Sequence, residues 1–125
     1  MKTSTLKSYF ENRIAFSDLI DSIHAEVMMY SDRMKHPGST IPLNFVEDEQ
    51  MHVTRNDFRR LLNDFAVSET STVALSYICD CLTLAERISH SDNALSEMIF
   101  DIADPEINGG YKSGLELTII SKNIE

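Results

Sequence analysis

Glycine is scarce in this sequence. The chain of 125 residues contains four glycines, at positions 38, 109, 110 and 114. They form neither a P-loop nor the glycine pattern of a dinucleotide-binding fold, because both motifs need several glycines at fixed short spacings ahead of a helix. Nucleotide chemistry is therefore not indicated.

Long apolar runs are also missing. A helix needs about 20 consecutive apolar residues to cross a bilayer, and no segment of this chain approaches that length. The N-terminal stretch MKTSTLKSYF lacks the uninterrupted apolar core of a signal peptide. We therefore expect a cytoplasmic protein with no membrane partner.

The chain has only two cysteines, Cys79 and Cys81. On a helix, side chains two positions apart point about 200° away from each other, so this pair is poorly placed for a disulfide or a shared metal. We expect both thiols to be reduced and one of them to lie in the core, where free cysteine commonly packs as a small apolar residue.

Histidine is equally uninformative about metals. The four histidines match no known ligand spacing. His24 lies on or beside the apolar face of its predicted helix, where a structural role is expected. The other three fall at predicted element boundaries, where exposure is expected: His36, His52 and His90. We therefore predict no metal site and no cofactor.

No catalytic group stands out either. Carboxylates such as Glu97 and Asp101 can act as acid and base, but glycosidases place such a pair across a concave cleft rather than along one exposed stripe. The pattern therefore does not indicate an enzyme.

Positive charge is the most informative shortage. The formal net charge is −9, and residues 64–110 contain nine acidic residues but a single basic one, Arg87. Such a surface repels nucleic-acid phosphates and attracts basic proteins. The same charge also keeps a small protein in solution, so charge alone leaves both interpretations open.

Apolar residues recur at spacings of three and four over most of the chain, which is typical of amphipathic helices. We predict an all-α fold: a compact single-domain bundle of about five to six helices spanning residues 1–125, with one long irregular loop at about 35–53. The last segment also suits a strand, but we favour a helix there. The predicted helices cover residues 4–12, 16–34, 55–67, 72–88, 92–103 and 113–123.

The predicted helix at residues 72–88 has the broadest apolar face, which indicates a central position with neighbours on two sides. The preceding helix exposes three arginines, Arg55, Arg59 and Arg60. The pair does not indicate a helix-turn-helix, because the second helix carries acidic and apolar residues that suit the major groove poorly. We expect no nucleic-acid partner.

The acidic residues of the next predicted helix lie on one face. Glu97, Asp101 and Asp104 are spaced at i, i+4 and i+7, and Glu106 follows Pro105. Like charges at this spacing, near a helix C-terminus, destabilise the helix slightly. A cationic partner would compensate for that cost, so these four residues are our first candidates for a partner-binding site.

Further candidates follow from the same reasoning. Phe100 adjoins Asp101 and is either an aromatic anchor within the acidic surface or a flank of the core. The remaining acidic candidates are two residues of the preceding segment and an outlying group in the long loop: Asp80, Glu86, Glu47, Asp48 and Glu49.

Three segments resemble a known class of protein. The stretches RNDFRRLLND, ALSYICDCLTLAE and LSEMIFDIADPEINGGY, within residues 55–111, are similar to small acidic immunity proteins encoded beside bacterial toxins, particularly those of contact-dependent growth inhibition systems. The resemblance implies a cytosolic protein that binds the C-terminal domain of its cognate toxin, commonly a nuclease, and blocks its active site. It implies no contact residues, since these immunity proteins differ greatly in fold and interface.

We therefore expect an immunity protein that neutralises a toxin, with a basic nuclease domain as its partner. A site that holds phosphates presents lysine and arginine, to which a carboxylate-rich surface is complementary. The alternative is an acidic helical adaptor or regulatory subunit that binds another basic protein.

Overall fold

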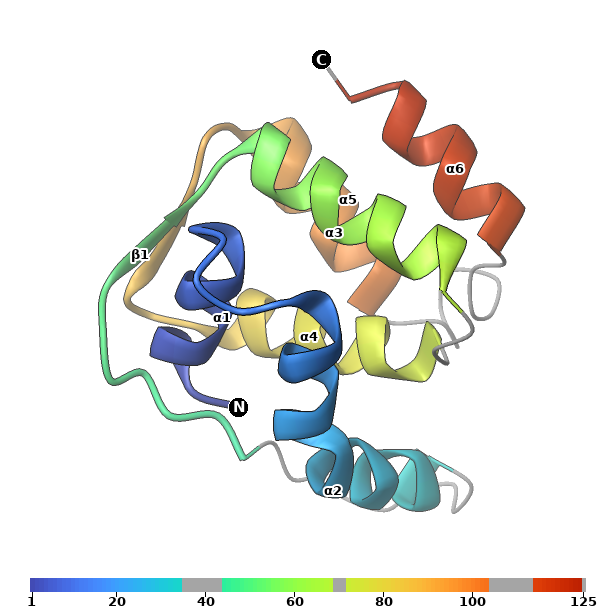
Figure 1. Ribbon diagram of the computed structural model, residues 1–125. Coiled ribbons are helices and arrows are strands. Elements are labelled where there is room, and N and C mark those ends of the chain that lie inside the picture. Colours follow the sequence, from blue (N-terminus) through green and yellow to red (C-terminus); the bar gives the residue numbers. More distant parts are fainter. Residues whose placement is uncertain (35–43, 69–71, 104–113, 125) are drawn as a thin grey trace.

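The computed structural model describes residues 1–34, 44–68, 72–103 and 114–124. Within these ranges the chain forms six helices and two short strands (Figure 1), which confirms the predicted helical fold, including its C-terminal helix. The elements in chain order are α1 (Thr3–Phe10), α2 (Phe16–Met34), β1 (Met51–Val53), α3 (Arg55–Val67), α4 (Thr72–Leu84), β2 (Ile88–His90), α5 (Asn93–Ala103) and α6 (Gly114–Lys122).

Helix α4 is the centre of the bundle, as its broad apolar face predicts. It packs against α2 on one side and α5 on another, while α3 packs against α6 (Figure 1). Every residue of α4 from Ala74 to Cys79 is buried. Both cysteines are buried as free thiols, and burial raises the pKa of the Cys81 thiol to about 12. These two residues therefore act as core residues.

The two strands are the feature that helical periodicity does not predict. β1 and β2 pair in parallel, with Met51 opposite Ile88 and Val53 opposite His90. The predicted irregular loop therefore ends in a strand. The predicted helix at 72–88 stops at Leu84 instead of reaching Ile88, which pairs with β1.

Glu47 explains where α4 ends. Its carboxylate accepts hydrogen bonds from the backbone N–H groups of Glu86, at 3.0 Å, and Arg87, at 2.8 Å. The guanidinium of Arg87 donates in return to the carbonyl of Glu47, at 3.0 Å. These bonds hold the chain after Leu84 in a bend at Glu86 and Arg87, which leads it into β2.

The segment before β1 is also tied to the start of the chain. The N–H of Thr3 donates to the carbonyl of Val46 at 3.0 Å, and the N–H of Val46 donates to the carbonyl of Met1 at 2.9 Å.

Among the helices of the described residues, none combines the length and apolar character that crossing a bilayer requires.

Candidate functional site

Helix α5 carries the candidate site, and Asp92 sets its starting point. The Asp92 carboxylate accepts from the N–H of Leu95 at 2.9 Å, which caps the first turn. Its other oxygen accepts from Nε of Arg55 at 2.7 Å. These hydrogen bonds, that from Arg55 first, hold the pKa of Asp92 below its usual value. The cap thus links the start of α5 to α3.

The buried face of α5 determines which residues point outward. Leu95, Ile99, Ile102 and Ala103 are buried against the rest of the bundle. The opposite face carries Glu97, Phe100 and Asp101, which we call the acidic ridge. Both carboxylates are exposed and Phe100 is 50% exposed, so all three are accessible to a partner.

The carboxylates of the acidic ridge have no ion pair within the part of the chain that the structure describes. Arg55 pairs with Asp92, while Arg60 donates to the carbonyl of Phe10 at 3.2 Å and lies over the ring of Tyr9. Both arginines are therefore engaged away from the ridge carboxylates.

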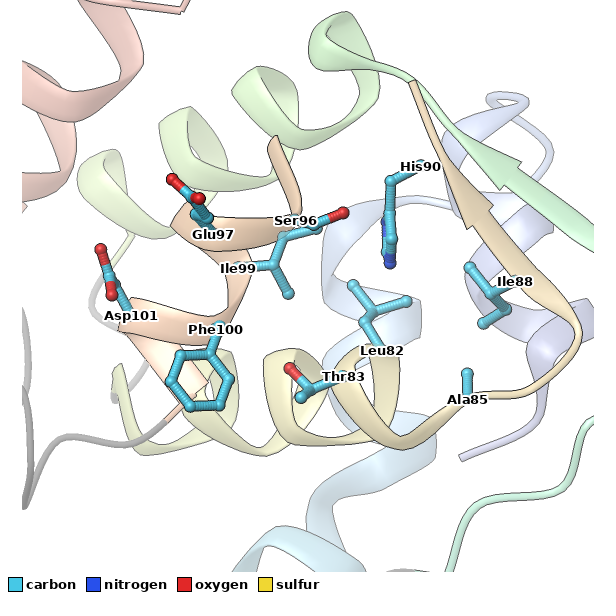
Figure 2. Close-up of a pocket in the computed structure, with 10 residues that line it drawn as sticks. All are labelled: Leu82, Thr83, Ala85, Ile88, His90, Ser96, Glu97, Ile99, Phe100 and Asp101. Carbon is cyan, nitrogen blue, oxygen red and sulfur yellow. The ribbon is translucent and has the colours of Figure 1, made fainter. Parts of the chain in front are cut away.

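A groove of about 560 Å³ lies beside the ridge, between α4, β2 and α5. Figure 2 shows the ridge residues along one side of this groove and two residues of β2 along the other, with the end of α4 between them. We call it the α4–β2–α5 groove. Its lining is Leu82, Thr83, Ala85, Ile88, His90, Ser96, Glu97, Ile99, Phe100 and Asp101.

A second depression lies on the other flank of the ridge, between α5 and α6. It has a volume of about 340 Å³ and is lined by Ala94, Glu97, Met98, Asp101, Ile102, Ile120 and Asn123. Glu97 and Asp101 border both hollows. The two carboxylates of the acidic ridge therefore have a partly apolar depression on either side.

His90 is a site residue that sequence reasoning placed among the exposed boundary histidines. It is half-buried in the α4–β2–α5 groove, and its Nδ1 is buried without a hydrogen-bond partner among the described residues. Burial, followed by the neighbouring His52, lowers the pKa of His90. The helical periodicity of the sequence does not predict the strand at residues 88–90, and it is this strand that places the ring in the groove.

Asp80 and the loop acids are placed differently from the ridge. Asp80 is half-buried and accepts a hydrogen bond from the hydroxyl of Tyr30, and Glu47 is occupied by the backbone after α4. Asp48 accepts from the hydroxyl and N–H of Ser4, bonds that lower its pKa. Glu49 lies 3.6 Å from Nζ of Lys7.

Glu86 is exposed and lies beside β2, in a shallow hollow with His52 and Ser89 that is separate from the ridge. The structure therefore brings together three of the predicted contacts, Glu97, Phe100 and Asp101, and leaves Glu86 apart from them. Asp104 and Glu106 lie outside the described residues.

No group of three histidine, cysteine or carboxylate side chains in the described residues is arranged to hold a metal ion. The chain matches no protein-family model, no curated protein and no solved structure.

Proposed function

We propose that this protein is an immunity protein that binds a basic toxin domain, a nuclease, through the acidic ridge of α5. The observation that carries the proposal is the pair of exposed carboxylates, Glu97 and Asp101, one helical turn apart and without a cationic partner in the described residues. Like charges at this spacing cost an isolated helix about 0.2–0.5 kcal/mol. A bound cation would remove that cost.

The residues around the ridge provide contact area that two carboxylates alone do not have. A stable protein interface buries about 1,600 Å² in total, far more than two carboxylates cover. Apolar side chains in the two flanking depressions and the half-exposed Phe100 extend the surface. Aromatic residues are enriched at interface centres and the surrounding rim is polar, so Phe100 suits the centre of an interface and the carboxylates suit its rim.

Inhibition would follow from charge complementarity. A nuclease holds phosphates with lysine and arginine, and an acidic ridge attracts the same groups. The inhibitor would then occupy the place of the anionic substrate. The net charge of −9 would also accelerate encounter with a basic domain at low ionic strength.

The first prediction concerns the double charge reversal Glu97→Lys with Asp101→Lys. Electrostatic steering can raise association rates by about 10- to 1,000-fold, so we expect association with a cognate toxin domain to slow at least about tenfold at low salt. The salt dependence of the association rate should flatten. Stopped-flow association measured over a salt series tests both effects.

A matched control makes the same charge change elsewhere. Asp21 and Asp32 are exposed acids of α2, so Asp21→Lys with Asp32→Lys changes the net charge equally without touching the ridge. If both double variants slow association to the same extent, the ridge has no special role.

Protection of cells that express the toxin separates the immunity function from an adaptor: an adaptor would bind a basic protein but leave those cells unprotected.

A further inference from the structure

The α4–β2–α5 groove differs chemically along its length. Leu82, Ile88 and Ile99 give its inner part an apolar lining, whereas Glu97 and Asp101 stand at its α5 edge (Figure 2). An occupant that matches both parts needs an apolar group and a cation close together. A protein segment carries this combination on neighbouring side chains.

Phe100 makes the outer part suited to a guanidinium or ammonium group. Its ring is half-exposed and lies on the same edge as Asp101 (Figure 2). A cation above an aromatic face is attracted by the ring, and the adjacent carboxylate adds a charge-assisted hydrogen bond. Arginine is the better fit, since its planar guanidinium stacks on an aromatic ring and can donate two parallel hydrogen bonds to a carboxylate.

His90 borders the inner part of the groove without repelling a cation. Burial and the neighbouring His52 lower its pKa, which favours the neutral ring at pH 7. Its Nδ1 is buried, so the exposed part of the half-buried ring serves as packing surface rather than as a hydrogen-bond acceptor.

We propose that the α4–β2–α5 groove receives a segment of the partner protein in which an arginine or lysine adjoins an apolar residue. The apolar side chain packs on Ala85 and Ile88, and the basic side chain lies over Phe100 toward Glu97 and Asp101. This inference rests on the proposed function, because it specifies how the acidic ridge engages a basic protein.

The first test needs no toxin. Amide chemical shifts of the full chain are followed by NMR during titration with N-acetyl-leucyl-arginine amide. We expect saturable shifts at residues that line the groove. The isosteric, uncharged N-acetyl-leucyl-citrulline amide should bind about two- to fivefold more weakly, and N-acetyl-alanyl-arginine amide should also bind more weakly. Equal binding of the citrulline peptide, or shifts confined to other surfaces, would overturn the proposal.

Two variants locate the binding. Thr83 is exposed at the end of α4 and lies between Phe100 and Leu82 (Figure 2), so Thr83→Trp fills the groove without changing charge. Phe100→Ala removes the stacking surface at an exposed position. Phe100→Ala should weaken binding of the leucyl-arginine peptide about two- to fivefold, and Thr83→Trp should weaken it by blocking the groove, with circular dichroism melts as the check on folding. Unchanged affinity in folded samples of both variants contradicts the inference.

The same variants separate the two proposals in the toxin assay. If charge reversal on the ridge slows toxin binding while Thr83→Trp leaves affinity unchanged, the ridge function stands and the groove inference fails. If neither change affects a toxin that the chain does bind, both fail.

Discussion

At the scale of single residues, the carboxylates of this chain divide into two groups. Asp92, Asp80 and Glu47 each accept hydrogen bonds within the described fold. Glu97 and Asp101 are exposed and make no such bond to described residues. Sequence alone does not separate these groups, because the donors that occupy the first group come from distant parts of the chain: Arg55, Tyr30 and Arg87.

His90 gives a residue-scale prediction about pH. Its pKa is lowered by burial and by His52, whereas an unfolded histidine titrates near about 6.5. Between these two values the unfolded chain binds more protons than the folded one. The free energy of unfolding should therefore fall as the pH drops below about 6.5, and the loss is complete below the folded pKa.

Replacing the ring should remove this dependence. We expect His90→Gln to flatten the change in urea midpoint between about pH 7.5 and about pH 5.5. His52→Gln removes a neighbouring charge and should raise the pKa of His90 toward its ordinary value, as measured by NMR titration. If His90 of the parent protein titrates with the ordinary pKa of histidine, the burial of its ring is contradicted.

At the scale of elements, helix α3 has the clearest local signal in the chain. Thr54 is its N-cap: the side chain accepts from the N–H of Asp57 at 3.1 Å, and the Asp57 carboxylate accepts from the N–H of Thr54 at 3.1 Å. This capping box satisfies two backbone donors that the first turn would otherwise leave without partners. The start of α3 is thus determined by four consecutive residues.

We therefore predict that Thr54→Ala lowers the free energy of unfolding by about 1 kcal/mol, the typical cost of removing such a cap. Thr54→Ser keeps the hydroxyl and should retain most of the stability. Urea unfolding of the three proteins provides the comparison. Equal midpoints for the alanine and serine variants would show that the capping bond contributes little.

The end of α4 is the opposite case. Helical periodicity continues beyond Leu84 to Ile88, yet the helix stops at Leu84, which is 68% exposed. The cause lies elsewhere in the chain, in Glu47 and in the pairing of β2 with β1. Parallel pairing joins residues far apart in sequence, so no local sequence pattern predicts it.

At the scale of the whole molecule, excess negative charge should oppose folding. The chain has twenty acidic and eleven basic residues, and among the described side chains three carboxylates pair with lysine or arginine: Glu49, Glu11 and Asp92. Self-repulsion of this kind destabilises the compact state.

Salt should therefore stabilise the protein. Raising NaCl from about 0.1 M to about 1 M shortens the screening length from about 10 Å to about 3 Å, and we expect the urea midpoint to rise. The double variant Glu97→Gln with Asp101→Asn should be more stable than the parent at low salt and respond less to added salt. A midpoint that falls with salt would mean that attractive ion pairs outweigh the repulsion.

The sequence by itself determined the helical class, the burial of α4 and the outward face of α5, because each depends on the spacing of apolar residues within one element. Helix α5 shows this well, since its periodicity separates buried Ile99 from exposed Glu97 and Asp101. Only the tertiary structure decided where α4 ends, that residues 51–53 pair with 88–90, and that His90 faces the ridge across a groove. The end of α4 and the strand pairing depend on Glu47 and β1, which are distant in sequence from α4 and β2, and the groove depends on how α4, β2 and α5 pack together. Contacts between elements leave no periodic pattern in any one of them.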